Sequence, residues 1–442
     1  MDTISKRYNN KSTTGKTFAS EEARLEKNTR IAATRKATKA RRAQLDCRTF
    51  DLKLKPYTRE QETKLKLLLL EAKWLRNYYL ATNDRETKLS GVPVRLPDGR
   101  FEQREFRVIG SQIKQSILEQ LDRDKRSLAA LKRKGRRIGG LKFEREHRAL
   151  ELKQVGTTYR IHNNQAHLQN LGWLQARGTR QLKDWELSTA RLVKQPDGYH
   201  LRVTAYGGAT QVNLVPDTKV GIDMGLKTHF TLSNGSKIKV SVEESKRARL
   251  LRRKLSRQVR KSKGYYRTLG LLKRELQKQG YMKDEIARKL SREFLRNEQV
   301  FIQDEQLNSW KRRKRARGGK VIQAGVHGRV KQRLKAHPRV TTLDKWVATT
   351  QSCKCGIKTK HSPSERIFQC SSCGFRHDRD VHASRNMIIL SPQGLGSALA
   401  ERVSDDQFWS QLAVKPETLE LEAQVLGRAW LSHETAGSSA QL

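Results

Sequence analysis

Two hydrophobic periodicities alternate along the first half of the chain. The stretch CRTFDLKLKPY, which begins at Cys47, has apolar side chains at every second position and runs into a proline, so it predicts a strand. Residues 58–139 instead read as helical, as in REQETKLKLLLLEAKWLRNYYLA. Strand patterns return within residues 141–206, in YRIHNNQAHL, WELSTARLV and YHLRVTAYG, with the turn sequence QPDG between the last two. A β-barrel interrupted by a helical insertion would give this order.

The second half contains both strand and helix patterns. VGID predicts a buried strand, and HFTLSNGSKI predicts a second strand that enters an Asn-Gly hairpin. Residues 242–296 are basic and helical with a break near KSKGYY, and VFIQDE from Val300 is a strand that ends in acids. A further helical segment with glycines leads to RVTTLD and then to a group of cysteines.

The charge balance points to a polyanionic partner. Among the 442 residues, Lys and Arg number 92 against 45 Asp and Glu, which gives a net charge of +47. A compact fold with this surplus repels itself unless a polyanion neutralises it, and nucleic acid is favoured over an acidic membrane. The sequence has no run of about 18 apolar residues and no signal-peptide pattern, so we expect an intracellular protein with no membrane partner.

Three segments show how this charge is distributed. Residues 1–46 are polar and basic, and form either a solvated tail or an arm that RNA orders. In residues 242–296 the density of lysine and arginine favours the wall of a nucleic-acid channel over a pair of solvated helices. The basic excess is lost near the end of the chain, so residues 393–442 read as a C-terminal tail.

Acidic residues stand out where strands end or a helix begins. They are Asp223 in VGIDMG, Asp304 and Glu305 in FIQDE, and Asp378 and Asp380 in HDRDVHAS. If the fold brings them together, their oxygens can bind two hard cations such as Mg²⁺, which activate water and stabilise the leaving oxygen of a phosphodiester. From spacing alone the alternative stays open, in which these carboxylates cap turns or lie on the surface.

Four of the five cysteines form a metal-ligand pattern at Cys353, Cys355, Cys370 and Cys373. In a reducing cytosol such a cluster predicts metal ligands in preference to disulfides. Four thiolates would hold one structural Zn²⁺ tetrahedrally. The second pair has the usual C-x-x-C spacing, whereas the first pair is one residue shorter.

Neighbouring residues complete this prediction. Gly356 and Gly374 each follow a cysteine pair and permit a tight turn. His361 lies in the loop between the pairs but is not needed as a ligand, because four thiolates already fill the tetrahedral shell. Cys47 lies far from the cluster and is predicted to be a buried free thiol.

These motifs, in this order, resemble the TnpB family of transposon-encoded RNA-guided nucleases and the miniature type V CRISPR effectors related to them. VGIDMGLKTHFTLSNG resembles the first RuvC motif, QDEQLNSW the second and DRDVHASRNM the third, while TTQSCKCG with RIFQCSSCGF resembles the zinc ribbon. CRTFDLKLKPY and LGWLQARGTR are similar to the wedge region. The resemblance spans roughly residues 47–392.

The resemblance implies catalytic, Mg²⁺-binding roles for Asp223, Glu305 and Asp380. Glu305 is preferred over Asp304 because the last acid in the related Q-D-E-N form of the second motif is its glutamate. In the third motif, alignment on the alanine and asparagine of DVHASRN makes Asp380 the ligand.

The third motif also departs from the family pattern. Alignment leaves Asp378 as a neighbour of the ligand position. His382 stands where the family usually has asparagine.

The resemblance also implies an α/β multidomain fold: a wedge β-barrel with an inserted helical recognition domain, and an RNase H-like RuvC nuclease domain carrying a zinc-ribbon insertion. The corresponding ranges are 1–46 for the basic arm, 47–57 and 140–215 for the wedge, 58–139 for the recognition domain, 216–348 and 378–392 for the nuclease domain, 349–377 for the ribbon and 393–442 for the tail.

The function implied is an RNA-guided DNA endonuclease that cuts next to a short flanking motif by two-metal hydrolysis. Its partners would be a guide RNA and target double-stranded DNA, and its cofactors two Mg²⁺ and one structural Zn²⁺. We expect a monomer, with a dimer as the alternative, in the prokaryotic cytoplasm in association with the nucleoid.

Two other functions remain. A nuclease-inactive RNA-guided repressor would lack a metal acid, and all three candidates are present here. A guide-independent transposase or junction nuclease would purify without RNA.

Overall fold

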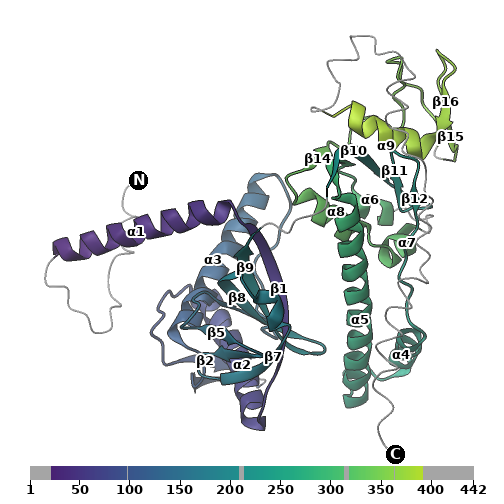
Figure 1. Cartoon of the computed structure of the whole chain (residues 1–442). Coiled ribbons are helices and arrows are strands. Elements are labelled where there is room, and N and C mark those ends of the chain that lie inside the picture. Colours follow the sequence, from purple (N-terminus) through teal and green to yellow (C-terminus); the bar gives the residue numbers. More distant parts are fainter. Residues whose placement is uncertain (1–20, 97, 209–213, 313–317, 363, 392–442) are drawn as a thin grey trace, which may run out of the picture. The chain divides into compact units, whose positions relative to one another are not determined.

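The structure is a computed structural model that describes residues 21–96, 98–208, 214–312, 318–362 and 364–391 (Figure 1). The chain divides into two compact units, Met1–Thr210 and Gln211–Leu442. Within the described ranges, no helix combines the length and the apolar character needed to cross a membrane. The start of the predicted basic arm, residues 1–20, and the predicted tail lie outside the described residues.

A seven-stranded antiparallel sheet forms the centre of the first unit (Figure 1). In spatial order its strands are β4 (Ala149–Leu152), β8 (Glu186–Gln195), β9 (Gly198–Gly207), β1 (Asp46–Lys55), β7 (Gly172–Arg177), β6 (Gln165–Leu168) and β5 (Tyr159–His162). The hydroxyl of Tyr159 on β5 donates to the carbonyl of Ser188 on β8 at 3.1 Å. The sheet therefore curls far enough for an outer strand to reach the opposite side.

Strand β1 shows why Cys47 is not a buried thiol. Leu52 and Leu54 point to the core and are almost fully buried, and Lys53 between them is exposed. Successive side chains of a strand point to opposite faces. Cys47 is an odd number of residues from both leucines, so it falls on the outer face and is exposed. The prediction of a buried Cys47 was wrong.

Two helices, α2 (Arg59–Thr82) and α3 (Ser111–Arg133), share one hydrophobic core with this sheet. A helical reading of all of residues 58–139 was wrong, because a hairpin of β2 (Gly91–Arg95) and β3 (Phe101–Glu105) separates the two helices. The segment alternates as GVPVR and FEQRE around an Asp-Gly turn, which favours a hairpin.

A buried acid fixes the segment that leaves this hairpin. Glu71 on α2 is fully buried. Its carboxylate accepts hydrogen bonds from the backbone N–H groups of Arg107, Val108 and Ile109 at 2.7, 3.1 and 2.8 Å. These bonds hold the entry to α3 against α2.

The second unit contains a five-stranded mixed sheet. In spatial order its strands are β12 (Lys237–Ile238), β11 (Phe230–Leu232), β10 (Val215–Met224), β13 (Asn297–Gln303) and β14 (Val340–Leu343). Strand β10 pairs antiparallel with β11 and parallel with β13, which in turn pairs parallel with β14. The unit thus joins an antiparallel hairpin to a row of parallel strands.

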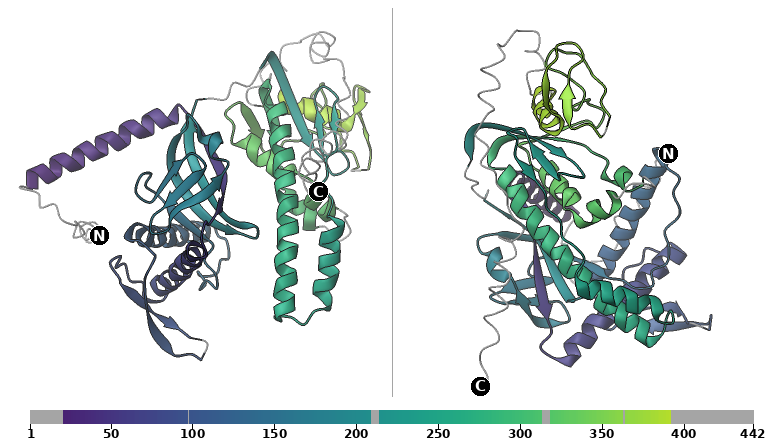
Figure 2. Two further views of the ribbon diagram at one scale, coloured as in Figure 1. Left: turned by 60° about the horizontal axis from the view of Figure 1, so that its bottom comes forward. Right: turned by 90° about the vertical axis from the view of Figure 1, so that its right-hand side faces the viewer.

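Helices surround this sheet. A long hairpin of α4 (Lys246–Arg257) and α5 (Lys263–Phe294) extends away from it (Figure 2), and the break between the two helices lies where KSKGYY predicted it. Leu290 and Phe294 of α5 share the sheet core with Val330 and Leu334 of α8 (His327–Lys335). The remaining elements are α6 (Leu307–Arg312), α7 (Gly318–Ala324), α9 (Arg379–Ile389), β15 (Ile367–Gln369) and β16 (Arg376–Asp378).

Candidate metal centres

Two of the predicted acids lie at or just beyond the ends of neighbouring parallel strands. Ile222 of β10 is in register with Ile302 of β13. Asp223 comes directly after Ile222, and Glu305 lies two residues beyond the end of β13. Because parallel strands end at the same edge of a sheet, both carboxylates lie at one edge, where open α/β sheets bind ligands.

The third acid reaches this edge through a direct contact between a helix and a strand. Helix α9, whose first turn carries Asp380, packs on β10. A Cβ atom at Gly221 would lie only 1.8 Å from the carbonyl oxygen of Ser384 on α9. Only glycine allows this approach, which lets α9 pack directly against the strand that carries Asp223.

The pKa of Asp223 indicates that acids from the other two motifs lie near it. Burial, followed by the negative charges of Asp380 and Glu305, raises the pKa of Asp223 to about 7, while Arg379 opposes the shift. Burial also raises the pKa of Glu305, where Lys331 opposes the shift. Asp223 therefore lies within electrostatic reach of an acid from each of the other two motifs, and carboxylates arranged in this way can attract a divalent cation.

The two alternative acids are engaged elsewhere. Asp304 forms ion pairs with Lys331 at 2.7 Å and Lys335 at 3.1 Å, and its hydrogen bonds to these lysines lower its pKa. Asp378 pairs with Lys237 at 2.7 Å and is the N-cap residue of α9. Burial opposes the lowering of the Asp378 pKa, but the hydrogen bond and charge of Lys237 and the hydrogen bonds from the backbone N–H groups of Val381 and Asp380 together outweigh it. Their geometry favours structural roles for both.

Asp380 has its own cationic partners. Arg366 Nη1 lies 3.2 Å and Arg379 Nη2 lies 3.6 Å from its carboxylate oxygens. Among the described His, Cys, Asp and Glu residues, only the four cysteines form a cluster of three or more whose ligand atoms all lie within 4.8 Å of one another. The acids therefore share an electrostatic neighbourhood without being as tightly grouped as the thiols.

The cysteine cluster has the geometry of a zinc site. Cys353 Sγ lies 3.6 Å from Cys373 Sγ, and Cys355 Sγ lies 3.6 Å from Cys370 Sγ. Tetrahedral Zn²⁺ with bonds of about 2.3 Å places its sulfur ligands roughly 3.8 Å apart. The four thiols therefore fit one structural zinc ion, and the short spacing of the first pair does not prevent the fit.

Backbone geometry sets the turns after both cysteine pairs and favours the thiolate of one cysteine. Gly356 and Gly374 have φ values of 85° and 69°, as tight turns after each pair require. The backbone N–H groups of Cys373 and Ser372 lower the pKa of Cys370 to about 6, which favours the thiolate. His361 instead pairs with Glu365 at 3.0 Å, so it is not a member of the cluster.

The ribbon is tied to α9 through buried polar groups. The ring of His382 stacks on Phe368 with centroids 4.1 Å apart, and its Nε2 lies 2.8 Å from the carbonyl of Ser352. Asn386 Nδ2 donates to the carbonyls of Ser352 and Thr349 at 2.7 Å each. His382 therefore fills a packing role, which explains why a ring is accommodated at a position where the family usually has asparagine.

Two residues at the acidic edge were not singled out from the sequence. Lys331 donates to the backbone carbonyl of Glu305 at 2.5 Å and pairs with Asp304, so it fixes the segment after β13. Gly221 sets the approach of α9. A glycine inside an apolar strand does signal close backbone contact, whereas a lysine in a basic helix carries no such signal.

The second metal centre lies inside a known domain type. The family described as "Cas12f1-like, TNB domain" matches residues 330–387, from α8 through the ribbon to α9. This segment of the chain is therefore similar to that domain. This match confirms the resemblance to TnpB proteins and the miniature type V effectors, and the TNB domain contains all four cysteines as well as Asp380.

Comparisons of the whole chain add a more distant likeness. The chain aligns with one chain of the "Cryo-EM structure of the Cas12f1-sgRNA-target DNA complex" at a TM-score of 0.42 and 15% identity. The alignment covers 63% of this chain and 71% of that chain. No curated protein matches the sequence.

Proposed function

We propose that the protein is an RNA-guided DNA endonuclease whose cutting site is formed by Asp223, Glu305 and Asp380. The observation that carries the proposal is the raised pKa of Asp223, because part of that shift comes from the charges of the other two acids. The Cas12f1-like TNB domain supports the same class of function, since it includes the third acidic motif.

In this proposal each acid has a position set by its own element. Asp223 and Glu305 extend from neighbouring parallel strands, and Asp380 extends from the first turn of α9. These carboxylates would hold two Mg²⁺ ions, which supply an activated water and stabilise the leaving oxygen when bound. Lys331 holds the Glu305 segment, and Arg366 holds the Asp380 carboxylate next to the ribbon.

The proposed domains follow the two units. The curled sheet with α2 and α3 would be the wedge and recognition regions, and the mixed sheet with α9 would be the RuvC-like nuclease domain. An antiparallel hairpin joined to parallel strands agrees with an RNase H-type core. The four-cysteine cluster would hold one Zn²⁺ within residues 349–377.

Nucleic-acid partners are proposed from charge. The net charge of +47 requires a large polyanion, and the α4–α5 hairpin places a dense series of arginines and lysines in the nuclease unit. Guide pairing would select the DNA, and the protein would hold the hybrid by its backbone and read a short flanking motif.

The decisive experiment is guided cleavage by an Asp223→Ala variant in Mg²⁺. We expect cutting to be lost while binding of the RNA-loaded protein to matching DNA stays within a few fold. Cutting by the variant at the parental rate would contradict the assignment of Asp223 to the cutting site. RNA in the purified protein, identified by sequencing, would distinguish a guided enzyme from a guide-independent nuclease, and cutting by the unmodified protein would exclude the inactive repressor.

A further inference from the structure

A basic helix in the first unit is attached to the sheet at one end. No described side chain of α1 (Glu21–Ala43) is buried. Its last turn is held by Glu186 of β8, whose carboxylate lies 2.7 Å from both Arg41 Nη1 and Arg42 Nη2. The guanidinium of Arg42 also lies over the ring of Tyr206 at 4.8 Å. The rest of the helix therefore presents its side chains to solvent.

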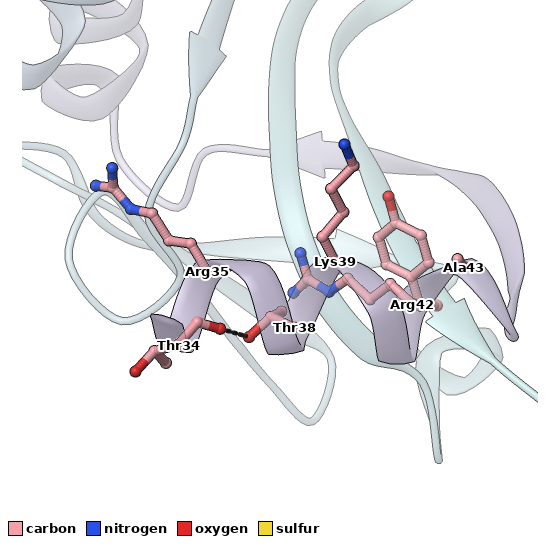
Figure 3. A pocket seen from close by; sticks show the side chains of 7 residues that line it. Thr34, Arg35, Thr38, Lys39, Arg42 and Ala43 are labelled. Atoms are coloured by element: carbon pink, nitrogen blue, oxygen red, sulfur yellow. Dashed lines mark hydrogen bonds between the residues drawn. The ribbon is translucent and has the colours of Figure 1, made fainter. Parts of the chain in front are cut away.

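A groove of about 480 Å³ lies between this helix and Tyr206. Its basic lining comes from Arg35, Lys39 and Arg42, whose side chains extend from neighbouring turns of α1 (Figure 3). The spacing i, i+4 and i+7 places these residues on one face of a helix. Tyr206 lines the groove from the sheet side.

Two of these three basic residues have no acidic partner in the described part of the chain. Arg35 and Lys39 are exposed and form no ion pair with any residue in the described ranges. After Glu26 the helix contains basic residues but no acidic ones. Like charges four residues apart destabilise a helix by a few tenths of a kcal/mol, and a helix with no buried side chain gains little from packing. A bound polyanion would remove both disadvantages.

We propose that this groove binds the phosphodiester backbone of the guide RNA, with Arg35 and Lys39 each contacting a phosphate. The inference rests on the proposed RNA-guided function and adds a site on the first unit. RNA is favoured over DNA because, in the proposed function, the guide is already bound before the protein meets its target, so it can neutralise the helix before any DNA binds. Backbone contacts of this kind are independent of base sequence.

The test compares two double variants of the full-length protein. Arg35→Gln/Lys39→Gln removes two charges from the groove. Arg30→Gln/Lys36→Gln removes two charges from the same helix but from residues that do not line the groove. Glutamine forms helix about as well as lysine and arginine. The probe is the RNA that co-purifies with the protein, transcribed in vitro, titrated onto RNA-free protein over a series of KCl concentrations.

We expect the groove variant to bind this RNA more weakly, with a salt slope less steep by roughly 1.4, since each lost contact to single-stranded RNA removes about 0.7. The control variant should change the slope by less than half of that. Equal slopes for the two variants, in a protein that still carries RNA and cuts DNA, would overturn this inference alone. A groove variant that binds the RNA normally but loses matching DNA would overturn it in favour of a DNA site. A preparation without RNA would overturn the proposed function and this inference together.

Discussion

The ring of His382 stacks on the ring of Phe368, with centroids 4.1 Å apart and planes inclined by 25°. His382 belongs to the helix that carries Asp380, and Phe368 lies between the two cysteine pairs. Both are almost completely buried. The cysteine ribbon therefore packs directly against the helix that carries the third acidic motif.

This contact predicts that His382→Asn destabilises the protein even though asparagine is usual in related chains. The substitution removes the ring stack and leaves space in a buried site, so we expect a loss of roughly 1–3 kcal/mol in the free energy of unfolding of the second unit. Urea denaturation measures it. The exposed His162 is the control, and His162→Asn should cost under about 0.5 kcal/mol. A His382→Asn protein as stable as the control would show that the stack contributes nothing.

The four-thiol cluster predicts one zinc ion per chain. Cys370→Ser should reduce the zinc content to near zero and lower the melting temperature, because binding of a structural metal contributes to folding. Cys47→Ser is the matched control, since Cys47 lies outside the cluster and is exposed. Metal analysis of the purified proteins decides the point. Retention of a full complement of zinc in Cys370→Ser would remove this cysteine from the ligand set.

The acidic edge predicts opposite outcomes for neighbouring carboxylates. Glu305→Gln should reduce guided cleavage by at least about two orders of magnitude, because it removes a proposed metal ligand. Asp304→Asn should retain most of the activity and lose no more than about 1 kcal/mol of stability, because its ion pairs with Lys331 and Lys335 are partly exposed.

The same comparison applies to α9. Asp380→Asn should abolish cutting, whereas Asp378→Asn keeps an N-cap residue and should still cut. Single-turnover cleavage rates of the four variants test the assignment. A reversal within either pair would move the metal site to the other acid.

A buried histidine predicts a loss of stability in acid. His327 is fully buried, and burial together with the neighbouring His229 lowers its pKa to about 4, although a hydrogen bond to the carbonyl of Gly225 opposes the shift. Its folded pKa is below the unfolded value of about 6.5, so its contribution is complete above pH 6.5 and is lost as the pH falls towards 4. The loss amounts to roughly 3 kcal/mol.

The measurement is the difference in unfolding free energy between the unmodified protein and His327→Gln, whose amide can still donate to Gly225. This difference should shrink by roughly 3 kcal/mol between neutral pH and pH 4. The exposed His162→Gln provides the control and should show no such trend. A pH-independent difference for His327→Gln would mean that the imidazole is not held neutral by burial.

Local patterns predicted many elements correctly. The strand that begins near Cys47 is present as β1, and the QPDG turn joins β8 to β9 with Gln195 opposite Gly198. These features depend on neighbouring residues alone. The β2–β3 hairpin was missed because its short strands interrupt a long helical region and one of them, FEQRE, carries little apolar character.

The site was harder to predict than the elements. The sequence offered two acids in each of two motifs, and the family resemblance was needed to choose Glu305 and Asp380. The structure adds a physical distinction, since Asp304 and Asp378 are paired with lysines from other elements. Such partners are distant in sequence and become neighbours only through tertiary packing, so no local pattern could identify them.

At Gly221 and Ser384, the backbone of β10 and the backbone of α9 lie in direct contact, with no side chain between them. A separation fixed by main-chain atoms does not change when the surrounding side chains are exchanged. Substitutions elsewhere along β10 and α9 can therefore accumulate while the spacing of Asp223 and Asp380 stays constant, provided that position 221 never acquires a methyl group.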